Sequence, residues 1–257
     1  RVYEDEGLVE NARRMGVQGV EVNTCGWSTA PHFDLKGMLG NPATQKAFLA
    51  AFADRGLAVI GLNANGNPLH PTDLAQGEGL RDTIRVAGEM GIKTVCTMSG
   101  LPAGNATDTM PNWVVSSWPP ETQAILRYQW EERLLPFWTE IVALARKSGV
   151  ERIALELHGN QCVYNVPSLL KLRAAVGSVV GANLDPSHLF WMGADPLAAA
   201  QPDGGTRSGC KAVPECRALD VHLLSGGGST GHCHCAGDLR DRHLAAGHSA
   251  VVAETLA

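Results

Sequence analysis

One pattern constrains the fold of this chain more than any other, because it occurs four times. A helical segment with apolar residues on one face ends at a glycine, and a short, mostly apolar segment follows closely. The four glycines are Gly16, Gly56, Gly91 and Gly149. Glycine is the usual residue just past a helix C-terminus, so each one predicts the end of a helix. Helices that alternate with short apolar strands indicate a parallel sheet, because parallel strands need a helical crossover between them.

The pattern predicts helices over residues 6–15, 42–55, 80–90, 123–148 and 167–176. It predicts strands over residues 17–23, 57–63, 93–98, 152–156 and 179–185. The segment 99–120 between a strand and a helix is predicted to be a long loop, and loops of that length in compact domains are often functional. The strands are nearly continuously apolar, which indicates burial on both faces of the sheet.

These elements predict an α/β fold of the (β/α)8 TIM-barrel class. Five strands are expected by residue 185, residues 218–223 and 250–254 are candidates for two more, and one strand is expected before Arg1. The 257 residues suit a single barrel domain of about 250 residues, spanning 1–257. Residues 1–200 carry the regular pattern, whereas 201–257 are atypical and rich in Gly, Ser, Cys and His. That segment is interpreted as a metal-rich loop, a divergent end or the product of a reading-frame error.

Composition excludes several classes of partner. The net charge is −5 and no cluster of Lys and Arg is present, so we expect no nucleic-acid partner. No apolar run is long enough to cross a bilayer, and the charged start lacks the apolar centre of a signal peptide. We therefore expect a cytoplasmic protein without a membrane partner. A zinc module built on the cysteines of the last fifth of the chain is disfavoured, because their spacing lacks the usual C-x2-C pair.

Polar residues at the ends of the predicted strands are the candidates for chemistry, because barrel active sites lie at the carboxyl ends of the strands. Glu156 and His158 leave one strand two residues apart, so their side chains are expected on the same side. Asp185 ends the next strand, and His188 follows three residues later. A helix N-cap is the alternative interpretation for Asp185. Asn63 ends an earlier strand and is a candidate to bind substrate.

Two loop residues are further candidates. His70 lies in the loop after the strand 57–63 and is predicted to bind substrate, with a surface position in a turn as the alternative. Trp113 lies in the long loop and is predicted to form an apolar wall against a sugar, with packing of the loop as the alternative.

Five segments resemble the xylose-isomerase-like barrel superfamily of sugar phosphate isomerases and epimerases. They are GVQGVEVN, AVIGLNANGNPLHP, RDTIRVAGEMGIKTVCTMSG, YQWEERLLPFWTEIVALARKSGVERIALELHG and VGANLDPSHLFWMGADP. The last two carry the specific part of the resemblance, which covers about residues 5–200.

The resemblance implies one divalent metal ion (Mn²⁺, Mg²⁺ or Zn²⁺) bound by Glu156 and Asp185, with His188 in contact with substrate or metal. The family's third ligand lies in a His-x-His-x-Lys-Asp run, which this sequence lacks, and its fourth is a Glu that ends the last strand. His222 and Glu254 are the possible substitutes. The implied reaction is proton transfer through a metal-stabilised enediolate on a sugar or sugar phosphate. Glu156 is then a ligand and possible base, and Glu254 a second base.

Several alternatives stay open from the sequence. A metal-mediated hydride shift is variant chemistry for the same site. An inositol-type dehydratase, or a metal-dependent hydrolase or endonuclease, is possible on the same barrel. A catalytically inactive, truncated barrel is the alternative outside enzymes. The expected partner is a small-molecule sugar, and a homo-oligomer is a further expectation.

Overall fold

The computed structural model describes residues 9, 12, 16–200 and 250–252, and these form one parallel β/α sheet. The strands are β1 (Gly19–Asn23), β2 (Ala58–Ala64), β3 (Thr94–Thr97), β4 (Arg152–Glu156), β5 (Val180–Asn183) and β6 (Ala250–Val252). Their order in the sheet is β5-β4-β3-β2-β1-β6, and every neighbouring pair is parallel. The carboxyl ends of the strands therefore meet at one edge of the sheet.

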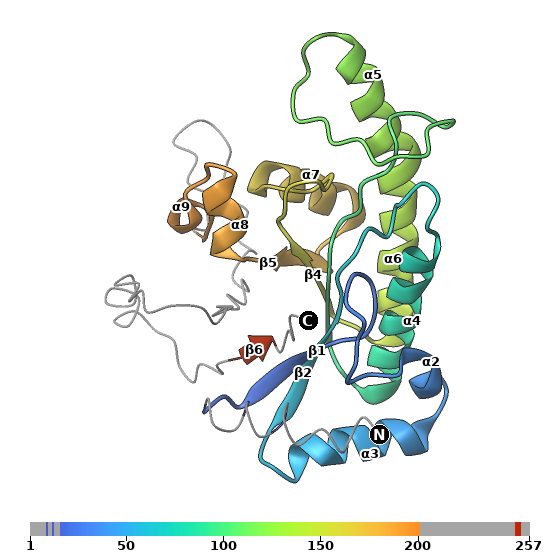
Figure 1. Ribbon diagram of the computed structural model, residues 1–257, viewed down its shortest axis with the longest axis vertical. Helices are drawn as coiled ribbons and strands as arrows, with labels where there is room; N and C mark the ends of the chain where they lie inside the picture. The colour runs from blue at the N-terminus through green and yellow to red at the C-terminus, as the bar shows by residue number, and fades with distance from the viewer. Residues whose placement is uncertain (1–8, 10–11, 13–15, 201–249, 253–257) are drawn as a thin grey trace.

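The helices are α2 (Leu35–Met38), α3 (Pro42–Ala53), α4 (Ala75–Met90), α5 (Glu121–Arg127), the π-helical segment η2 (Tyr128–Leu134), α6 (Leu135–Ser148), α7 (Val166–Val176), α8 (Pro186–Trp191) and α9 (Pro196–Ala200). Figure 1 shows α3, α4 and α6 on the outer side of the sheet, and α8 and α9 beside the end of β5. α5 continues the line of α6 and projects beyond the sheet. This is the arrangement that right-handed β/α crossovers produce.

The core lies between the strands and the outer helices. Leu62 of β2, Ile153 of β4 and Ile84 of α4 are fully buried, as is Trp138 of α6. The indole Nε1 of Trp138 donates a hydrogen bond of 2.9 Å to the carbonyl of Ser99, so its polar atom is paired. Packing of the strands against the outer helices holds their carboxyl ends at fixed positions.

α4 and α6 approach each other closely at a glycine. A Cβ atom on Gly88 would lie 2.1 Å from the carbonyl oxygen of Ser148. On the exposed side of the same pair of helices, Arg81 donates to both carboxylate oxygens of Glu140, at 2.7 and 2.9 Å. The hydrogen bonds from Arg81 lower the pKa of Glu140. The two helices are thus joined by backbone contact inside and by a two-point ion pair outside.

The structure confirms the predicted strands up to residue 185 to within two residues at each end. The predicted strand 250–254 is present as β6, which pairs with β1, while residues 253–254 lie outside the described part. The predicted strand 218–223 also lies outside it, as does most of the predicted helix 6–15. The described residues thus supply six parallel strands of the predicted α/β fold.

Two helix predictions were wrong in detail. α4 begins at Ala75 rather than residue 80. The predicted helix 123–148 is divided into α5, η2 and α6. Pro136 follows η2, and a proline cannot donate the backbone hydrogen bond that a continuous α-helix needs at that position. No helix in the described part of the chain is both long and apolar enough to span a bilayer.

Candidate metal centre

Glu156, Asp185 and His188 converge at the carboxyl ends of β4 and β5. One possible ligand atom from each lies within 4.8 Å of those of the other two. Glu156 is the last residue of β4, Asp185 precedes α8, and His188 lies in the first turn of α8. The side chains of Glu156, Asp185 and His188 are 7%, 12% and 21% exposed. Among the described residues, this is the group of acidic and imidazole side chains with the spacing of a metal site.

Both carboxylate oxygens of Glu156 are held by hydrogen bonds. His188 Nε2 lies 2.7 Å from Oε1, and the amide Nδ2 of Asn65 donates to Oε2 at 2.5 Å. Trp191 Nε1 donates to His188 Nδ1 at 3.4 Å, which fits the tautomer with its hydrogen on Nε2. Glu156 is therefore held in one orientation by Asn65, from the loop after β2, and by His188 of α8.

The two carboxylate oxygens of Asp185 make different contacts. Its Oδ1 accepts the backbone N–H of Ser187 at 2.7 Å, so it is the N-cap of α8, as the alternative interpretation predicted. Its Oδ2 faces His188 Nε2 at 3.6 Å. The capping bond leaves the second oxygen directed at the Glu156 side of the cluster. The local sequence Asp-Pro-Ser-His explains this placement, because Pro186 occupies the first turn of α8 and starts the helix directly after Asp185.

His158 lies beside His188, which contacts Glu156. The two imidazole rings are 4.1 Å apart between centroids and nearly perpendicular. Trp191 packs against His158 at 5.8 Å. His158 Nδ1 lies 2.5 Å from the carbonyl of Gly159. His158 thus packs beside the cluster, between His188 and Trp191.

Asn63 lies deeper and contacts a different carboxylate. It donates to Oε1 of Glu21 at 2.6 Å, and the thiol of Cys96 reaches Oε2 of Glu21 at 2.6 Å. Glu21, Asn63 and Cys96 are all buried. Asn63 Oδ1 accepts the backbone N–H of Asn65 at 2.8 Å. Asn63 therefore orients the loop that carries Asn65, and Asn65 is the residue that touches Glu156.

His70 is placed in a turn. Its Nδ1 accepts the backbone N–H groups of Thr72 and Asp73, at 3.2 and 3.0 Å. These bonds match the turn alternative, and none of the hydrogen bonds found for His70 in the described residues reaches Glu156, Asp185 or His188.

Trp113 is half buried and packs edge-on against Tyr164 at 5.5 Å. A Cβ on Gly159 would lie 3.2 Å from Trp113 and 2.2 Å from Trp191. The absence of a side chain at Gly159 therefore lets the indoles of Trp113 and Trp191 pack against the backbone next to His158. Trp113 thus lies close to the cluster.

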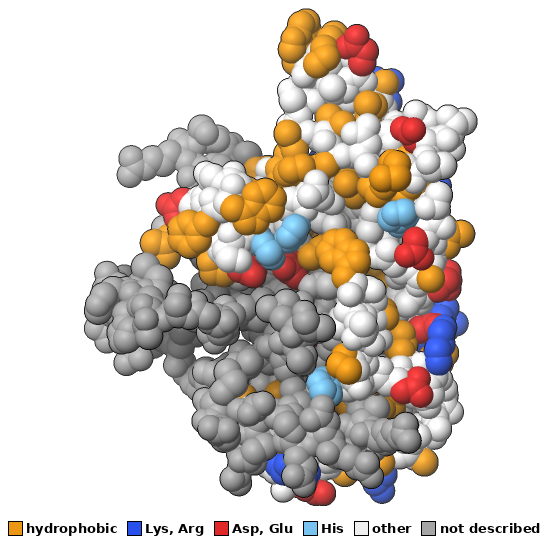
Figure 2. Space-filling view, in the orientation of Figure 1, with side chains coloured by type: hydrophobic (Ala, Val, Ile, Leu, Met, Phe, Trp, Pro, Cys, Tyr) orange, Lys and Arg blue, Asp and Glu red, His pale blue; other side chains and the backbone are white. Residues whose placement is uncertain are grey.

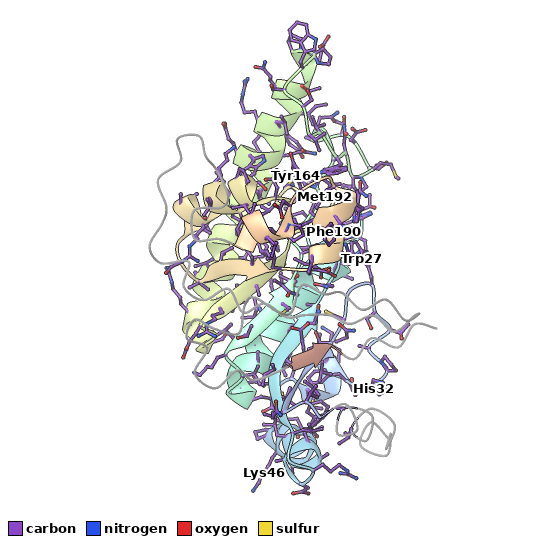
Figure 3. All side chains as sticks on the ribbon, turned by 90° about the vertical axis from the view of Figure 1, so that its left-hand side faces the viewer. Trp27, His32, Lys46, Tyr164, Phe190 and Met192 are labelled. Carbon is purple, nitrogen blue, oxygen red and sulfur yellow. The ribbon has the colours of Figure 1, made fainter. Side chains whose placement is uncertain are left out.

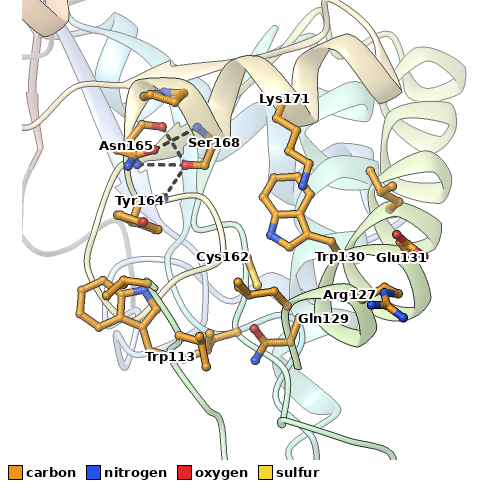
Figure 4. Close-up of a pocket in the computed structure, with 16 residues that line it drawn as sticks. Trp113, Arg127, Gln129, Trp130, Glu131, Cys162, Tyr164, Asn165, Ser168 and Lys171 are labelled. Carbon is orange, nitrogen blue, oxygen red and sulfur yellow. Dashed lines mark hydrogen bonds between the residues drawn. The ribbon is translucent and has the colours of Figure 1, made fainter. Parts of the chain in front are cut away.

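Trp113 also lines a cavity of about 500 Å³ between η2, α7 and the long loop. Figure 4 shows Trp130 and Tyr164 on its walls, with Lys171 stacked over Trp130 at 3.9 Å. Burial raises the pKa of the Cys162 thiol in this cavity to about 12, so that thiol stays protonated at neutral pH. Glu156, Asp185 and His188 do not line the cavity. We place the candidate chemistry at the three converging ligand atoms rather than in the cavity, since the cavity lacks a comparable cluster.

The surface around the cluster is apolar. Figure 2 shows histidine and acidic side chains next to one another on this face, with hydrophobic side chains around them. Trp191 and Phe190 of α8 are 55% and 68% exposed, and Trp27 after β1 is 57% exposed. In the view of Figure 3, the labels of Phe190 and Trp27 appear next to each other. Exposed aromatic side chains next to a polar cluster are typical of ligand-binding surfaces.

Two of the predicted site residues, His222 and Glu254, lie outside the described residues. The sequence prediction missed two asparagines. Asn65 contacts Glu156 directly, and Asn183 of β5 is the register partner of Glu156 in the sheet. The signals were the spacing of two residues between Asn63 and Asn65, and between Asn183 and Asp185, which places both members of each pair on one side of an extended chain.

The donor set fits a divalent cation. The cluster offers carboxylate oxygens and an imidazole nitrogen, which are the ligands that Mg²⁺, Mn²⁺ and Zn²⁺ take in proteins. Acceptors exceed donors around it, because the side-chain oxygens of Asn65 and Asn183 are buried without a hydrogen-bond partner. A cation would satisfy this excess of acceptors.

A parallel β/α sheet with acidic and histidine side chains at the carboxyl ends of adjacent strands defines the class of protein: a barrel built around a candidate metal centre. The family model described as "Xylose isomerase-like TIM barrel" matches residues 9–254. The chain therefore belongs to the xylose isomerase-like TIM barrel family.

The chain is also similar to individual proteins. An uncharacterized protein of Bacillus subtilis (strain 168), YfiH, is 45% identical over 205 residues, covering 77% of this chain and 65% of YfiH. The crystal structure of the probable 3-DHS dehydratase AsbF from Bacillus anthracis matches with a TM-score of 0.51 at 20% identity, covering 76% of this chain and 62% of AsbF. A D-tagatose 3-epimerase-like protein matches with a TM-score of 0.50 at 17% identity, covering 76% of this chain and 66% of its own. The chain thus spans less than two thirds of each relative, and the two structures show likeness of fold alone.

Proposed function

We propose that this chain is a divalent-metal-dependent isomerase or epimerase of sugars or sugar phosphates. The observation that carries the proposal is the convergence of Glu156, Asp185 and His188 within 4.8 Å at the carboxyl ends of β4 and β5. Family members with similar folds include proteins described as an epimerase-like protein and as a probable dehydratase, so the proposal selects one of the reaction types associated with this fold.

Glu156 and Asp185 would hold the cation, with His188 beside them. When bound, the cation would act as a Lewis acid toward the carbonyl and hydroxyl oxygens of the sugar and stabilise the negative charge that develops when a proton leaves the adjacent carbon. Two carboxylates that share one small site repel each other, and a bound divalent cation would remove that cost. This explains why both are kept close in a largely buried position.

The residues around the cation would bind and orient the substrate. His188 Nε2 faces the carboxylates of Glu156 and Asp185, so the imidazole would hold or return a proton at a substrate oxygen bound beside them. His158, Trp191 and Trp113 form a wall of rings beside it. Such a wall can pack against the apolar face of a sugar and exclude water from the reacting carbons.

The experiment combines metal binding with product analysis. The chain would be titrated with Mn²⁺ by calorimetry and incubated with ketoses, aldoses and their phosphates in D2O, and the products analysed by mass spectrometry after chelation. An isomer or epimer with one deuterium supports proton transfer, and one without deuterium supports the hydride-shift variant. A product lighter by one water indicates a dehydratase instead, and absence of Mn²⁺ binding contradicts the proposal.

Two variants make the assignment specific to the site. Glu156→Gln keeps the size of the side chain but removes its charge, and should reduce Mn²⁺ affinity and turnover together. Glu151→Gln is the matched control, because Glu151 is exposed just before β4. A Glu156→Gln protein as active as the parent would remove Glu156 from the mechanism.

A further inference from the structure

Buried polar atoms that lack a hydrogen-bond partner are rare in folded proteins, and each one needs an explanation. The described residues contain three: Oδ1 of Asn65, Nε1 of Trp113 and Oδ1 of Asn183. All three belong to the surroundings of the candidate metal centre. Asn65 donates to Glu156, Trp113 approaches Gly159 next to His158, and Asn183 pairs in register with Glu156.

Asn183 is the most informative of the three, because it is only 2% exposed. Glu156 and Asn183 are direct partners between β4 and β5, and side chains of register partners point to the same side of a parallel sheet. Asp185 follows two residues later with an extended backbone, so it continues on the same side. Asn183, whose amide oxygen lacks a partner, thus has a candidate ligand beside it on β4, Glu156, and another two residues further along its own chain, Asp185.

The surroundings of this oxygen determine what can pair with it. An amide oxygen accepts hydrogen bonds and binds cations, but it gains nothing from an ionised carboxylate. Its neighbour in register, Glu156, is an acceptor whose two oxygens are already held by Asn65 and His188. A protein that buries such an oxygen without a partner pays a desolvation cost, which a bound cation or a hydroxyl group would recover. The buried Oδ1 of Asn183 is thus suited to accept a hydrogen bond from a bound ligand, because no group in the described residues donates to it.

We propose that Asn183 is an additional member of the cation site, whose side-chain oxygen accepts from water or a substrate hydroxyl held by the cation. This inference rests on the proposed function. In this proposal Asn183 binds the water or hydroxyl groups around the cation, and Glu156, Asp185 and His188 are the other members of the site.

The test is Mn²⁺ affinity by calorimetry, together with the melting temperature of the metal-free protein. Asn183→Leu removes the oxygen and keeps a similar volume. It should weaken Mn²⁺ binding about tenfold, as the loss of an outer partner of a metal site does. The metal-free protein should melt at the same temperature or higher, because an unpaired buried polar group has been replaced by an apolar one. A purely structural asparagine would show the reverse: a lower melting temperature and unchanged affinity.

A charge variant tests whether the side chain faces the ion. Asn183→Asp has the same shape, and it should tighten Mn²⁺ binding at least about tenfold if the new charge lies a few ångströms from the cation. Asn165→Asp is the matched control, because it adds the same charge at the N-cap of α7, where Asp and Asn are equivalent. If Asn183→Leu does not fold, Asn183→Val replaces it.

The outcomes separate the two proposals. If the parent binds no Mn²⁺, the metal centre and this inference both fail. If the parent binds Mn²⁺ but the apolar variant binds equally well, or Asn183→Asp binds no more tightly than Asn165→Asp, the role of Asn183 is overturned and the proposed function stands.

Discussion

The amide Nδ2 of Asn65 lies 2.5 Å from Oε2 of Glu156, so the loop after β2 holds a carboxylate at the end of β4. These residues are 91 positions apart in the sequence. The contact continues inward, because the backbone N–H of Asn65 bonds to Asn63, and Asn63 bonds to Glu21. A chain of hydrogen bonds therefore joins β1 and β2 to the candidate ligand on β4, although β3 lies between them in the sheet.

Removal of the Asn65 amide should loosen Glu156. We expect Asn65→Ala to weaken Mn²⁺ binding about 10- to 100-fold, because groups that orient a metal ligand have effects of this size. Calorimetric titration measures it. Asn160→Gly is the control, since it removes an exposed amide from the loop after β4, and glycine accepts the backbone φ of 58° at that position. Equal affinity of Asn65→Ala and parent would show that Asn65 does not position the ligand.

The sequence predicted the three converging residues because each of them follows a strand closely. Glu156 ends an apolar strand, and Asp185 and His188 surround a Pro-Ser pair that starts a helix. Both features depend only on neighbouring residues, so they can be recognised in the sequence. The contact of Asn65 with Glu156 was not predictable in the same way, because it depends on how far the loop after β2 reaches across the sheet. The prediction chose Asn63, which lies on the strand and contacts Glu21 instead.

The start of α4 shows a second limit of sequence reasoning. The helix was predicted to begin at residue 80, after Gly77 and Gly79. In the structure both are helical and tightly packed: a Cβ on Gly77 would lie 2.8 Å from the carbonyl of Pro68, and one on Gly79 would lie 2.8 Å from Cys25 Sγ. Glycine is therefore present for tertiary packing, which overrides its poor helix propensity. Local sequence carries no sign of such a contact.

The contact between α4 and α6 predicts a destabilising substitution that helix propensity would favour. Gly88→Ala should gain about 1 kcal/mol of helix propensity. It should lose more than that through overpacking, because the added Cβ would lie 2.1 Å from a backbone oxygen of Ser148. We expect a lower urea midpoint of unfolding than for the parent. Gly181→Ala is the control, because no atom lies within 4 Å of a Cβ at that position. A Gly88→Ala protein as stable as the control would contradict the close approach of the helices.

The ion pair between α2 and α4 predicts a pH dependence of stability. Burial alone would raise the pKa of Asp82, but hydrogen bonds from Lys36 and Arg85 outweigh it and lower the pKa below its ordinary value of 3.8. A carboxyl with a lowered folded pKa stabilises the fold above its unfolded pKa, and the contribution is lost as pH falls through the folded value. Asp82→Asn should therefore lower the melting temperature by about 2–4 °C at pH 7.

The difference between this variant and the parent should begin to shrink as pH falls below about 3.8, and should vanish once pH is below the lowered folded pKa of Asp82. Thermal melts between pH 2.5 and 7 measure the difference. Asp54→Asn is the comparison, since Asp54 is exposed at the end of α3. A pH-independent difference between Asp82→Asn and parent would mean that the effect is not due to the charge of Asp82.

The two functions of Asp185 predict that stability and metal binding can be separated in one side chain. Asp185→Asn keeps an oxygen that accepts the backbone N–H of Ser187, and asparagine is as good an N-cap as aspartate, so the melting temperature of the metal-free protein should hardly change. The substitution removes a charge from the candidate metal centre, and Mn²⁺ affinity should fall by about 100-fold or more, since even outer partners of a ligand account for 10- to 100-fold. Asp185→Ala loses both functions and should be less stable as well as unable to bind. The decisive comparison is between the two variants: if Asp185→Asn binds Mn²⁺ as the parent does, Asp185 only caps α8, and the carboxylate of Glu156 has no acidic partner among the described residues with which to hold a cation.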